Sequence, residues 1–421
     1  MKVLWVVNTI FPDLAVEIGL DKPVVGGWMY GLSKALAQKN VTLTIATAKT
    51  NVSGYYGKVG SITYYLINGK KPITEYDPTL EVQWRRIVDR EKPDLIHIHG
   101  TEYAPGLVLI KNHPSIPCVI SIQGLTHIIA RYYAAGISKW EIFKNITFKD
   151  IIKRNSISKA QKHYQVRGKE IEHRYLSLTK NVIGRTQWDH DHVKTINPKL
   201  KYHFCNESLR DAFYSSGKWN IKTKVDFSIF LSQAGYPLKG FHKVVEACFL
   251  IKNDFPELKI RIAGNDILKN SGGLKEKLRR DGYGKYVQNL VRKFRIQDNI
   301  EFLGYLDEKQ MIKEYLDCNV FICPSSIENS PNSLGEAQIL GVPCIASYVG
   351  GIPSMIENGE TGLLYRFSEI EQLAKHISRI FIDEKLALKL SKGGINEAEK
   401  RHNRAANLEQ LQSIYTAILE Q

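Results

Sequence analysis

The chain of 421 residues has no uninterrupted apolar run of the eighteen or so residues needed to span a bilayer. It has no C-x-x-C pair either, and its six cysteines are scattered, so the sequence predicts neither a zinc site nor a disulfide framework. The apolar run at the N-terminus is too short for a signal peptide and is followed by no small-residue cleavage site, so we expect a first β-strand there. Short-period repeats and low-complexity stretches are also missing. We therefore expect a globular protein located in the cytoplasm.

Acidic residues are too few to balance the basic ones, because 43 Asp and Glu stand against 58 Lys and Arg and give a net charge of +15. Basic proteins bind phosphates, whether in nucleic acid, anionic lipid or nucleotides. The excess is concentrated in residues 138–174, where ten Lys or Arg stand against four acids and alternate with apolar side chains such as Trp140, Phe143 and Phe148. This mixture is typical of a helical segment that binds a membrane surface. The alternative is a solvated helical insertion whose apolar side packs on its own domain.

Strand and helix patterns alternate through both halves of the chain. Helical patterns, such as those at 80–90 and 241–253, lie between short apolar runs of strand length. This alternation predicts the α/β class, with parallel, doubly wound sheets that bind ligands at the carboxyl ends of their strands. The predicted strands lie at 3–7, 41–46, 62–67, 95–99 and 118–122, and again at 227–231, 258–263, 300–303 and 318–323.

A polar, poorly patterned stretch near 207–223 separates the two halves. We therefore expect an N-terminal Rossmann-like domain at 1–206, which carries the basic insertion at about 138–174. A C-terminal Rossmann-like domain is expected at 207–395, followed by a helical tail at 396–421.

The most informative segment runs from Pro324 to Gly351 and places two carboxylates, Glu328 and Glu336, eight residues apart. A strand pattern precedes them, and a helix pattern begins at about Ser333, with Glu336 in its first turn. A strand, a turn and a helix N-terminus in this order make an anion site, because free backbone N–H groups and the helix dipole point out of the loop. The carboxylates can accept hydrogen bonds from sugar hydroxyls, so the segment fits a nucleotide sugar. The alternatives are a solvated Glu328 and a capping box formed by Ser333 and Glu336.

The same segment resembles the signature region of the retaining GT4 glycosyltransferases (glycosyltransferase group 1), which have the GT-B fold. The resemblance implies two Rossmann-like, doubly wound domains that face a central cleft, with the acceptor loops in the first domain and the donor loops in the second. It also implies a C-terminal helix that crosses back to the first domain. The matching residues, in chain order, are Pro324, Ser325, Glu328, Glu336, Ala337, Gly341, Pro343, Gly350, Gly351, Gly359, Thr361 and Gly362.

Lys239 and Gly240 follow the predicted strand at 227–231 and resemble the family's K-G element, in which the lysine holds the donor phosphates. A lysine at a βα turn reaches a diphosphate as a point charge, and the glycine lets the backbone approach. The arginine that the family often has about five residues earlier is missing, because that position falls near Gln233. Either Arg261 or Lys285 would then supply a second cation, or backbone N–H groups would hold the phosphate.

The resemblance also covers the first half of the chain. The glycine pair at 26–27 resembles the family's glycine-rich loop, with Gly27 near the donor, and the stretch 93–100 resembles its fourth strand, with His99 against the acceptor. Gln123 stands where relatives have a histidine that meets the donor sugar. A glutamine can form hydrogen bonds with a sugar hydroxyl but cannot carry a proton. His127 replaces that histidine, or contacts the acceptor, only if the chain turns back.

The donor site implied by the resemblance collects residues from several places in the second half. No carboxylate is identified as a covalent nucleophile, so we expect front-face attack, in which the leaving phosphate accepts the acceptor's proton. No D-x-D pair lies at a strand end, so we expect neither a metal nor a cofactor. The members of the site are Lys239 and the N–H groups of Asn332, Ser333 and Leu334 for the diphosphate, Glu328 for the sugar hydroxyls, Glu336 for the ribose, and Gly264 at a wall of the nucleobase pocket.

The resemblance thus predicts a retaining glycosyltransferase that moves a hexose-type sugar from a nucleotide-diphosphate donor to a hydroxyl of a glycan or lipid-linked glycan. A UDP-sugar is expected before a GDP-sugar, because UDP-sugars are common donors in the family. The basic segment predicts peripheral contact with anionic lipid at the inner face of the cell membrane, and with it a role in cell-surface polysaccharide or lipopolysaccharide synthesis. The alternative is a nucleotide-sugar epimerase or hydrolase of the same fold. A nucleic-acid-binding protein would explain the charge but would leave Lys239, Glu328 and Glu336 without a purpose, so we expect no nucleic-acid partner.

Overall fold

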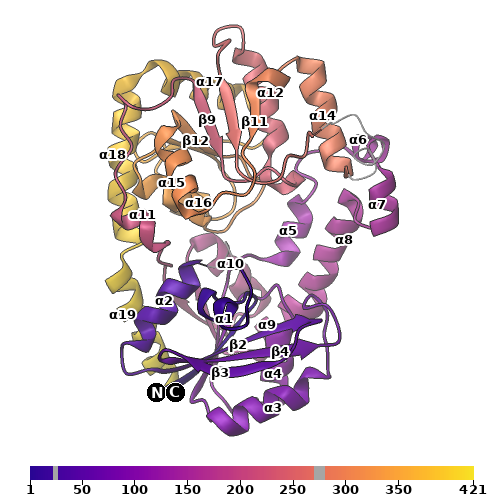
Figure 1. The fold of residues 1–421 in the computed structure, drawn as a ribbon, viewed down its shortest axis with the longest axis vertical. Helices are drawn as coiled ribbons and strands as arrows, with labels where there is room; N and C mark the ends of the chain where they lie inside the picture. The colour runs from indigo at the N-terminus through magenta and orange to yellow at the C-terminus, as the bar shows by residue number, and fades with distance from the viewer. Residues whose placement is uncertain (22–26, 270–279) are drawn as a thin grey trace. The chain divides into compact units, whose positions relative to one another are not determined.

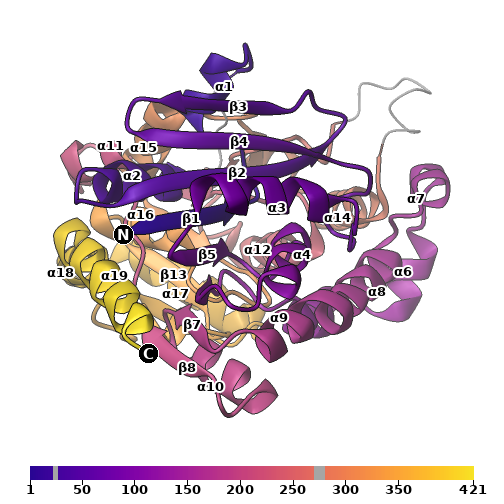
Figure 2. The same ribbon diagram turned by 90° about the horizontal axis from the view of Figure 1, so that it is seen from below.

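The computed structural model describes residues 1–21, 27–269 and 280–421, which form two compact units. The first unit comprises Met1–Ile128, Gln165–Arg210 and His402–Gln421. In its described part, eight strands form one sheet in the order β3-β4-β2-β1-β5-β6-β7-β8 (Figure 2), and only the β3–β4 pair is antiparallel. The strands are β1 (Lys2–Val7), β2 (Thr42–Thr50), β3 (Tyr55–Val59), β4 (Ile62–Gly69), β5 (Leu95–His99), β6 (Cys118–Ser121), β7 (Asn181–Gly184) and β8 (Lys201–Phe204).

The central strands of this sheet are buried along most of their length because helices cover both of its faces. All five residues of β5 are buried, and so are all residues of β1 after Lys2. On one face α2 (Gly27–Ala37) and α19 (Arg404–Leu419) contribute apolar side chains to the core. On the other face the core is completed by α3 (Leu80–Glu91), α4 (Pro105–Asn112) and α9 (His173–Leu178). Further helices of this unit are α1 (Pro12–Glu17), α10 (Gln187–Ile196) and the π-helical turn Gly168–Glu172 just before α9.

The C-terminal helix α19 belongs to the first unit although the chain reaches it from the second. Its Tyr415 hydroxyl accepts a hydrogen bond from Trp5 Nε1 at 2.9 Å and lies 2.6 Å from His97 Nδ1. The return begins at His402 rather than at 396, because α18 (Glu384–Arg401) continues to Arg401 within the second unit.

The second unit comprises Ile129–Tyr164 and Asp211–Arg401. Its described strands form a fully parallel sheet in the order β11-β10-β9-β12-β13-β14 (Figure 1). Because β9 and β12 are neighbours but not consecutive, the strand order reverses between them, and in doubly wound sheets ligands bind at such a reversal. The strands are β9 (Ser228–Leu231), β10 (Lys259–Ile262), β11 (Ile300–Phe302), β12 (Val320–Cys323), β13 (Cys344–Ser347) and β14 (Leu363–Tyr365).

Helices surround this second sheet (Figure 1). α12 packs on α17, and α16 packs on α18. Their bounds, with those of the other helices of this unit from 211 onwards, are α11 (Asp211–Ser215), α12 (Phe241–Ile251), α14 (Gly282–Phe294), α15 (Glu308–Asp317), α16 (Asn332–Ile339) and α17 (Ile370–Ile382).

Residues 129–164 belong to the second unit, so their predicted place in an N-terminal domain at 1–206 is wrong. The Ser326 hydroxyl donates to the carbonyl of Tyr132 at 2.9 Å, and His242 Nε2 lies 2.9 Å from the carbonyl of Ala135. These contacts join residues more than a hundred positions apart, which no local pattern reveals. The segment contains the end of α5 (Thr126–Tyr132), then α6 (Lys139–Lys144), α7 (Phe148–Lys153) and most of α8 (Ile157–Arg167).

Within the described ranges, no helix combines the length and the apolar content needed to cross a bilayer.

Candidate functional site

Lys239 and Glu328, predicted from two separate motifs, are in direct contact. Lys239 ends a single turn of 3₁₀ helix, Pro237–Lys239, in the connection after β9, and Glu328 follows β12. The Lys239 Nζ atom lies 2.6 Å from Glu328 Oε1, which also accepts a hydrogen bond from the Ser325 hydroxyl at 2.8 Å. Both side chains are largely shielded, with exposures of 20% and 16%. A cation and a carboxylate therefore meet where the strand order reverses.

Two glycines of the motifs hold this pair in place. Gly240 has a φ of +68°, and a Cβ atom there would lie 1.8 Å from the carbonyl oxygen of Pro324. Gly350 has a φ of +52°, and a Cβ atom there would lie 2.0 Å from the carbonyl oxygen of Glu328. The N–H of Gly351 donates to the same Glu328 carbonyl at 3.0 Å. The loop that carries Glu328 is thus fixed on both sides by backbone contacts that only glycine permits.

The charge of Lys239 is stabilised by its neighbours. Burial alone would lower the pKa of Lys239, but the Glu328 carboxylate and the Tyr236 hydroxyl outweigh it and raise that pKa. The Nζ atom also lies 5.8 Å from the centre of the Tyr236 ring, which in turn stacks on Tyr133 with ring centres 6.5 Å apart. Lys239 therefore remains a cation at neutral pH. Tyr133 comes from the 129–164 segment and was not foreseen, because sequence reasoning gave that segment to the other domain.

Helix α16 begins one residue earlier than predicted, at Asn332, and this changes the reading of its first turn. Its N-cap residue is Pro331, and no side chain caps it, so the capping-box alternative for Ser333 and Glu336 is wrong. The N–H of Leu334 donates to the Pro331 carbonyl at 3.0 Å, which occupies one of the three predicted phosphate donors. Glu336 lies in the second turn, not the first, and is only 6% exposed.

A cavity of about 860 Å³ lies at the carboxyl ends of β9, β10 and β11, where the nucleobase pocket was predicted. Gly304 and Asn265 line it, and the N–H of Gly264 donates to the Gly304 carbonyl at 2.7 Å. Tyr305 is 76% exposed, and its hydroxyl accepts a hydrogen bond from Asn265 Nδ2 at 2.8 Å. The charged side chains that line this cavity, which sequence reasoning did not select, are Lys149, Asp266, Lys269, Arg280 and Asp281.

Neither Arg261 nor Lys285, the two candidates for a second cation at the donor phosphates, fits that role. Arg261 forms two hydrogen bonds to Glu314, at 2.7 and 2.9 Å, and a further ion pair with Glu301. The Lys285 ammonium donates to the carbonyl of Lys144 at 3.1 Å. Both cations are thus engaged by other groups, and Lys239 remains the cation that the motifs place at the end of β9.

In the first unit, Gln123 follows β6 and is held by a buried ion pair. Its Nε2 atom donates to Glu207 Oε1 at 2.8 Å, and Arg185 pairs with the other oxygen of the same carboxylate. Arg185 also donates to the carbonyl of Ile122 at 3.3 Å. Sequence reasoning missed Arg185 and Glu207. The available signal was an arginine directly after the short, partly apolar run NVIG at 181–184, a position that corresponds to the carboxyl end of a strand.

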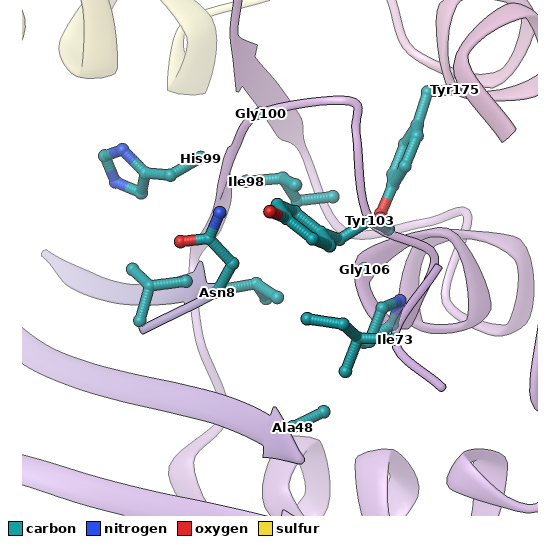
Figure 3. Close-up of a pocket in the computed structure, with 12 residues that line it drawn as sticks. Asn8, Ala48, Ile73, Ile98, His99, Gly100, Tyr103, Gly106 and Tyr175 are labelled. Carbon is teal, nitrogen blue, oxygen red and sulfur yellow. The ribbon is translucent and has the colours of Figure 1, made fainter. Parts of the chain in front are cut away.

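His99 is 4% exposed and packs among aromatic rings rather than on an open surface. Its ring centre lies 4.4 Å from that of Trp5 and 4.0 Å from that of His97, and neither of its ring nitrogens has a hydrogen-bond partner. Burial lowers the pKa of His99 to about 3, so its ring is neutral. Two cavities of about 20 Å³ adjoin it, each large enough for one water molecule. Figure 3 shows one of them, with the His99 ring pointing away from Tyr103. Contact between His99 and an acceptor stays a prediction.

His127 is oriented by a buried carboxylate, that of Glu172. Its Nδ1 atom pairs with Glu172, which also accepts hydrogen bonds from the N–H groups of Thr126 and His127, at 2.6 and 3.2 Å. Among the described residues, His127, Glu172 and His173 are the one group whose potential metal ligands lie within 4.8 Å of one another. Because the Glu172 oxygens already accept these hydrogen bonds, a structural role accounts for the cluster.

Gly27 opens α2 beside Arg210, and Gly26 lies outside the described residues.

Glu102 gives a test of the electrostatics at this edge of the first sheet. Its Oε1 atom accepts a hydrogen bond from the N–H of Gly124 at 2.9 Å, whereas Oε2 is buried without a partner. Burial, with help from the neighbouring Glu172, raises the pKa of Glu102 to about 7. A carboxyl group with a raised pKa stabilises the fold below its unfolded pKa, near 4.5, and this contribution is lost as the pH rises toward 7.

We therefore expect Glu102→Gln to be more stable than the unsubstituted protein at pH 8 but equally stable at pH 4.5. The gain at pH 8 should be about 1–3 kcal/mol, because the unfolded chain no longer gains by ionising this group. Melting temperatures of both proteins across this pH range measure the difference. A difference that does not change with pH would show that Glu102 ionises normally in the folded state.

Comparison with known proteins adds the family. The model of "Glycosyltransferase Family 4" matches residues 25–196, and that of "Glycosyl transferases group 1" matches 214–397. The capsular polysaccharide biosynthesis glycosyltransferase CapM of Staphylococcus aureus is 26% identical over 183 residues, which is 44% of either chain. N-acetyl-alpha-D-glucosaminyl L-malate synthase of Bacillus anthracis is 28% identical over 133 residues, or 32% of this chain and 34% of the relative. The matched stretches thus span less than half the length of these relatives.

Solved structures extend the likeness to the whole fold. Sucrose-phosphate synthase of Thermosynechococcus elongatus has a TM-score of 0.72 at 18% identity, over 100% of this chain and 99% of that one. Anabaena HepE, in complex with UDP and glucose, has a TM-score of 0.63 at 14% identity, over 99% of each chain. The predicted α/β class and GT-B fold are therefore confirmed. With one family model on each half, the chain belongs to the GT4-type glycosyltransferases of group 1.

Proposed function

We propose that this protein is a glycosyltransferase that moves a hexose-type sugar from a nucleotide-diphosphate donor to a hydroxyl of a glycan, with retention at the anomeric carbon. One observation carries the proposal: Lys239 and Glu328, from motifs 89 residues apart, form a shielded 2.6 Å contact where the order of the second sheet reverses. A cation can stabilise the leaving diphosphate there, and a carboxylate can accept hydrogen bonds from the sugar.

In this proposal the donor diphosphate lies between Lys239 and the first turn of α16. The N–H groups of Asn332 and Ser333, at the first two positions of that helix, and the helix dipole add to the charge of Lys239. Because Pro331 has no N–H, the first backbone donor available to the phosphate is that of Asn332. The departing phosphate accepts the proton of the attacking hydroxyl, and Gln123, oriented by Glu207, contacts the sugar without carrying that proton. The proposal needs neither a metal nor a cofactor.

We propose a UDP-sugar as donor, and the names of relatives support this choice. HepE and the TarM protein of S. aureus were solved in complex with UDP. CapM is named for capsular polysaccharide biosynthesis, and the WcaL protein of Salmonella typhimurium, 27% identical over 146 residues, for colanic acid biosynthesis. By analogy, the acceptor here is a growing cell-surface polysaccharide or lipopolysaccharide, carried on a lipid at the inner face of the cell membrane.

A nucleotide screen followed by a turnover assay tests the proposal. A bound donor raises the melting temperature by mass action, so UDP and its sugars should stabilise the protein more than GDP or ADP do. The stabilising sugar nucleotide is then incubated with and without glycan acceptors. Release of UDP only when an acceptor is present supports transfer. Sugar release or epimerisation from the donor and water alone would favour a nucleotide-sugar hydrolase or epimerase.

Glu336 tests the ribose contact within this site. We expect Glu336→Gln to weaken nucleoside-diphosphate binding by ~10-fold or more, because hydrogen bonds to a charged group contribute about 1.5–3 kcal/mol. Isothermal titration with UDP measures the affinity, and 2′-deoxy-UDP serves as the control, since it should bind the variant and the unsubstituted protein more equally. Equal loss for both nucleotides, or no loss, would place the ribose elsewhere.

A further inference from the structure

The helices α6 and α7, with the turn between them, expose an unusual amount of apolar surface. We call residues 138–154 the α6–α7 hairpin. Of the 23 large hydrophobic side chains exposed in the described parts of the chain, six lie within thirteen consecutive residues of this hairpin. Single exposed apolar residues are ordinary, but a contiguous group marks a surface that binds something. The six are Trp140, Phe143, Ile146, Phe148, Ile151 and Ile152, each between 37% and 67% exposed.

The hairpin is firmly folded, so its exposed side chains are not the result of a loose segment. Thr147 and Asp150 form a complete capping box at the start of α7. Ile142 and Asn145 are buried, and Asn289 of α14 donates from its Nδ2 atom to Asn145 Oδ1 at 2.9 Å. Figure 1 shows α6 beside α14. One side of the hairpin is therefore anchored to the second unit, and the other presents apolar side chains outward.

The charges on the hairpin narrow the choice of partner. Lys139, Lys144, Lys153 and Arg154 are exposed, whereas of its two acids Asp150 is buried in the capping box and only Glu141 is partly exposed. Apolar side chains combined with cations suit an anionic bilayer, where the rings enter the interface and the cations contact lipid phosphates. The second half of the basic segment differs, because α8 has no comparable group of large apolar side chains exposed.

We propose that the α6–α7 hairpin is the surface by which the second unit binds an anionic lipid bilayer. The proposal rests on the proposed function for the place of the acceptor, but not for the binding itself. It ties membrane binding to the unit that carries Lys239 and Glu328. Residues 132–135, just before the hairpin, contact Ser326 and His242 of that unit, so docking fixes the distance of the donor site from the membrane.

Co-sedimentation of the full chain with vesicles tests the proposal. Binding should be strong to vesicles of phosphatidylcholine with 30% phosphatidylglycerol and weak to phosphatidylcholine alone, and it should fall at high salt because the surface potential is screened. Replacing three apolar side chains of the hairpin by serine should weaken binding at least ~10-fold, because each contributes to burial in the interface. The hairpin variant is Trp140→Ser/Phe143→Ser/Ile151→Ser, and the matched control, on exposed apolar side chains elsewhere in the unit, is Val225→Ser/Ile382→Ser/Leu388→Ser.

A second pair of variants tests the charges. Lys139→Glu/Lys153→Glu should abolish the preference for anionic vesicles, whereas the same change at exposed lysines of α18, Lys385→Glu/Lys392→Glu, should leave it. Equal binding of the hairpin variants and their controls, or no binding by the unsubstituted protein, would overturn the proposal. Sedimentation velocity tests whether the hairpin instead binds a second copy of the chain. If the unsubstituted protein is a dimer that does not bind vesicles, and the hairpin variant is a monomer, the hairpin is an interface between copies and the membrane proposal is overturned.

The stabilisation by UDP, measured on the same variants, separates the two proposals. Vesicle binding that persists when no nucleotide stabilises the protein would support the docking surface and count against the proposed function. Loss of vesicle binding with unchanged stabilisation by UDP is the expected result for the hairpin variants. Their substituted side chains take no part in the Lys239–Glu328 contact and do not line the cavity at the ends of β9, β10 and β11.

Discussion

Replacing either Lys239 or Glu328 by alanine is expected to lower sugar transfer by ~100-fold or more, because each change removes a group that acts on the developing charge of the transition state. The two side chains contact one another at 2.6 Å, so each also holds the other in position. Removing one leaves its partner shielded and without its counter-ion. We therefore expect the double variant to lose little more activity than either single variant, as is typical of residues that act as a unit.

The measurement is a double-mutant cycle on kcat/KM for transfer, with the melting temperature of each variant recorded alongside. A matched control is available in the neighbouring helix α12, where Lys243 and Glu246 form an ion pair of 2.9 Å with side-chain exposures of 16% and 17%. Lys243→Ala removes a pair of similar burial outside the motifs, and it should keep most of the activity. Full activity in both Lys239→Ala and Glu328→Ala would remove the assignment of the donor site, and an equal loss in Lys243→Ala would reduce it to an effect of folding.

The meeting of Lys239 and Glu328 could be predicted from the sequence because it follows from topology. Two βα turns at the carboxyl ends of neighbouring parallel strands lie close together, and a sequence of alternating strands and helices implies that arrangement. The pairing of β9 with β12 realises it. The glycines could be predicted for a related reason, since close approaches of two backbones exclude every other residue.

Contacts between distant segments could not be predicted in this way. Residues 129–164 are joined to the second unit by hydrogen bonds from Ser326 and His242 to backbone carbonyl groups. Every residue has such a carbonyl group, so the sequence does not show which ones accept these hydrogen bonds. The pair of Arg185 and Glu207 was missed because neither residue belongs to a motif. His99 was expected at an acceptor surface from its place at the end of a strand, but the aromatic rings around it come from elements that no spacing connects.

The basic segment shows the limit of composition as a guide. The charge count over residues 138–174 predicted a single membrane-binding segment. In the structure this segment divides into the α6–α7 hairpin, which has clustered exposed apolar side chains, and α8, which has no such cluster. A composition counts buried and exposed side chains alike. Asp150, for example, is buried in the capping box with Thr147, so its carboxylate does not face the same surface as the exposed lysines. A net charge thus narrows the class of partner but does not locate its binding surface.

Gly240 and Gly350, the two glycines that contact the backbone of residues 324–328, are the basis of the second prediction on sugar transfer. We expect Gly240→Ala and Gly350→Ala each to lower sugar transfer by ~100-fold or more. The added Cβ atoms would lie 1.8 Å from the Pro324 carbonyl oxygen and 2.0 Å from the Glu328 carbonyl oxygen, so the loop has to move by about 1 Å. A displacement of that size at reacting groups can reduce a rate about 10²-fold, even though no side chain of the site has been removed.

Positive φ alone would also strain an alanine, by roughly 1–2 kcal/mol, and a control separates this strain from the displacement of the loop. Gly60 has a φ of +61° in the turn between β3 and β4, and no atom lies within 4 Å of the position that a Cβ atom would take there. Gly60→Ala should lower the melting temperature but keep sugar transfer nearly unchanged. Assays of kcat/KM at a temperature well below every melting transition then compare folded proteins. If Gly240→Ala and Gly350→Ala transfer sugar as well as Gly60→Ala does, the contact of Lys239 with Glu328 does not depend on the two close backbone approaches, and the catalytic importance assigned to that geometry is wrong.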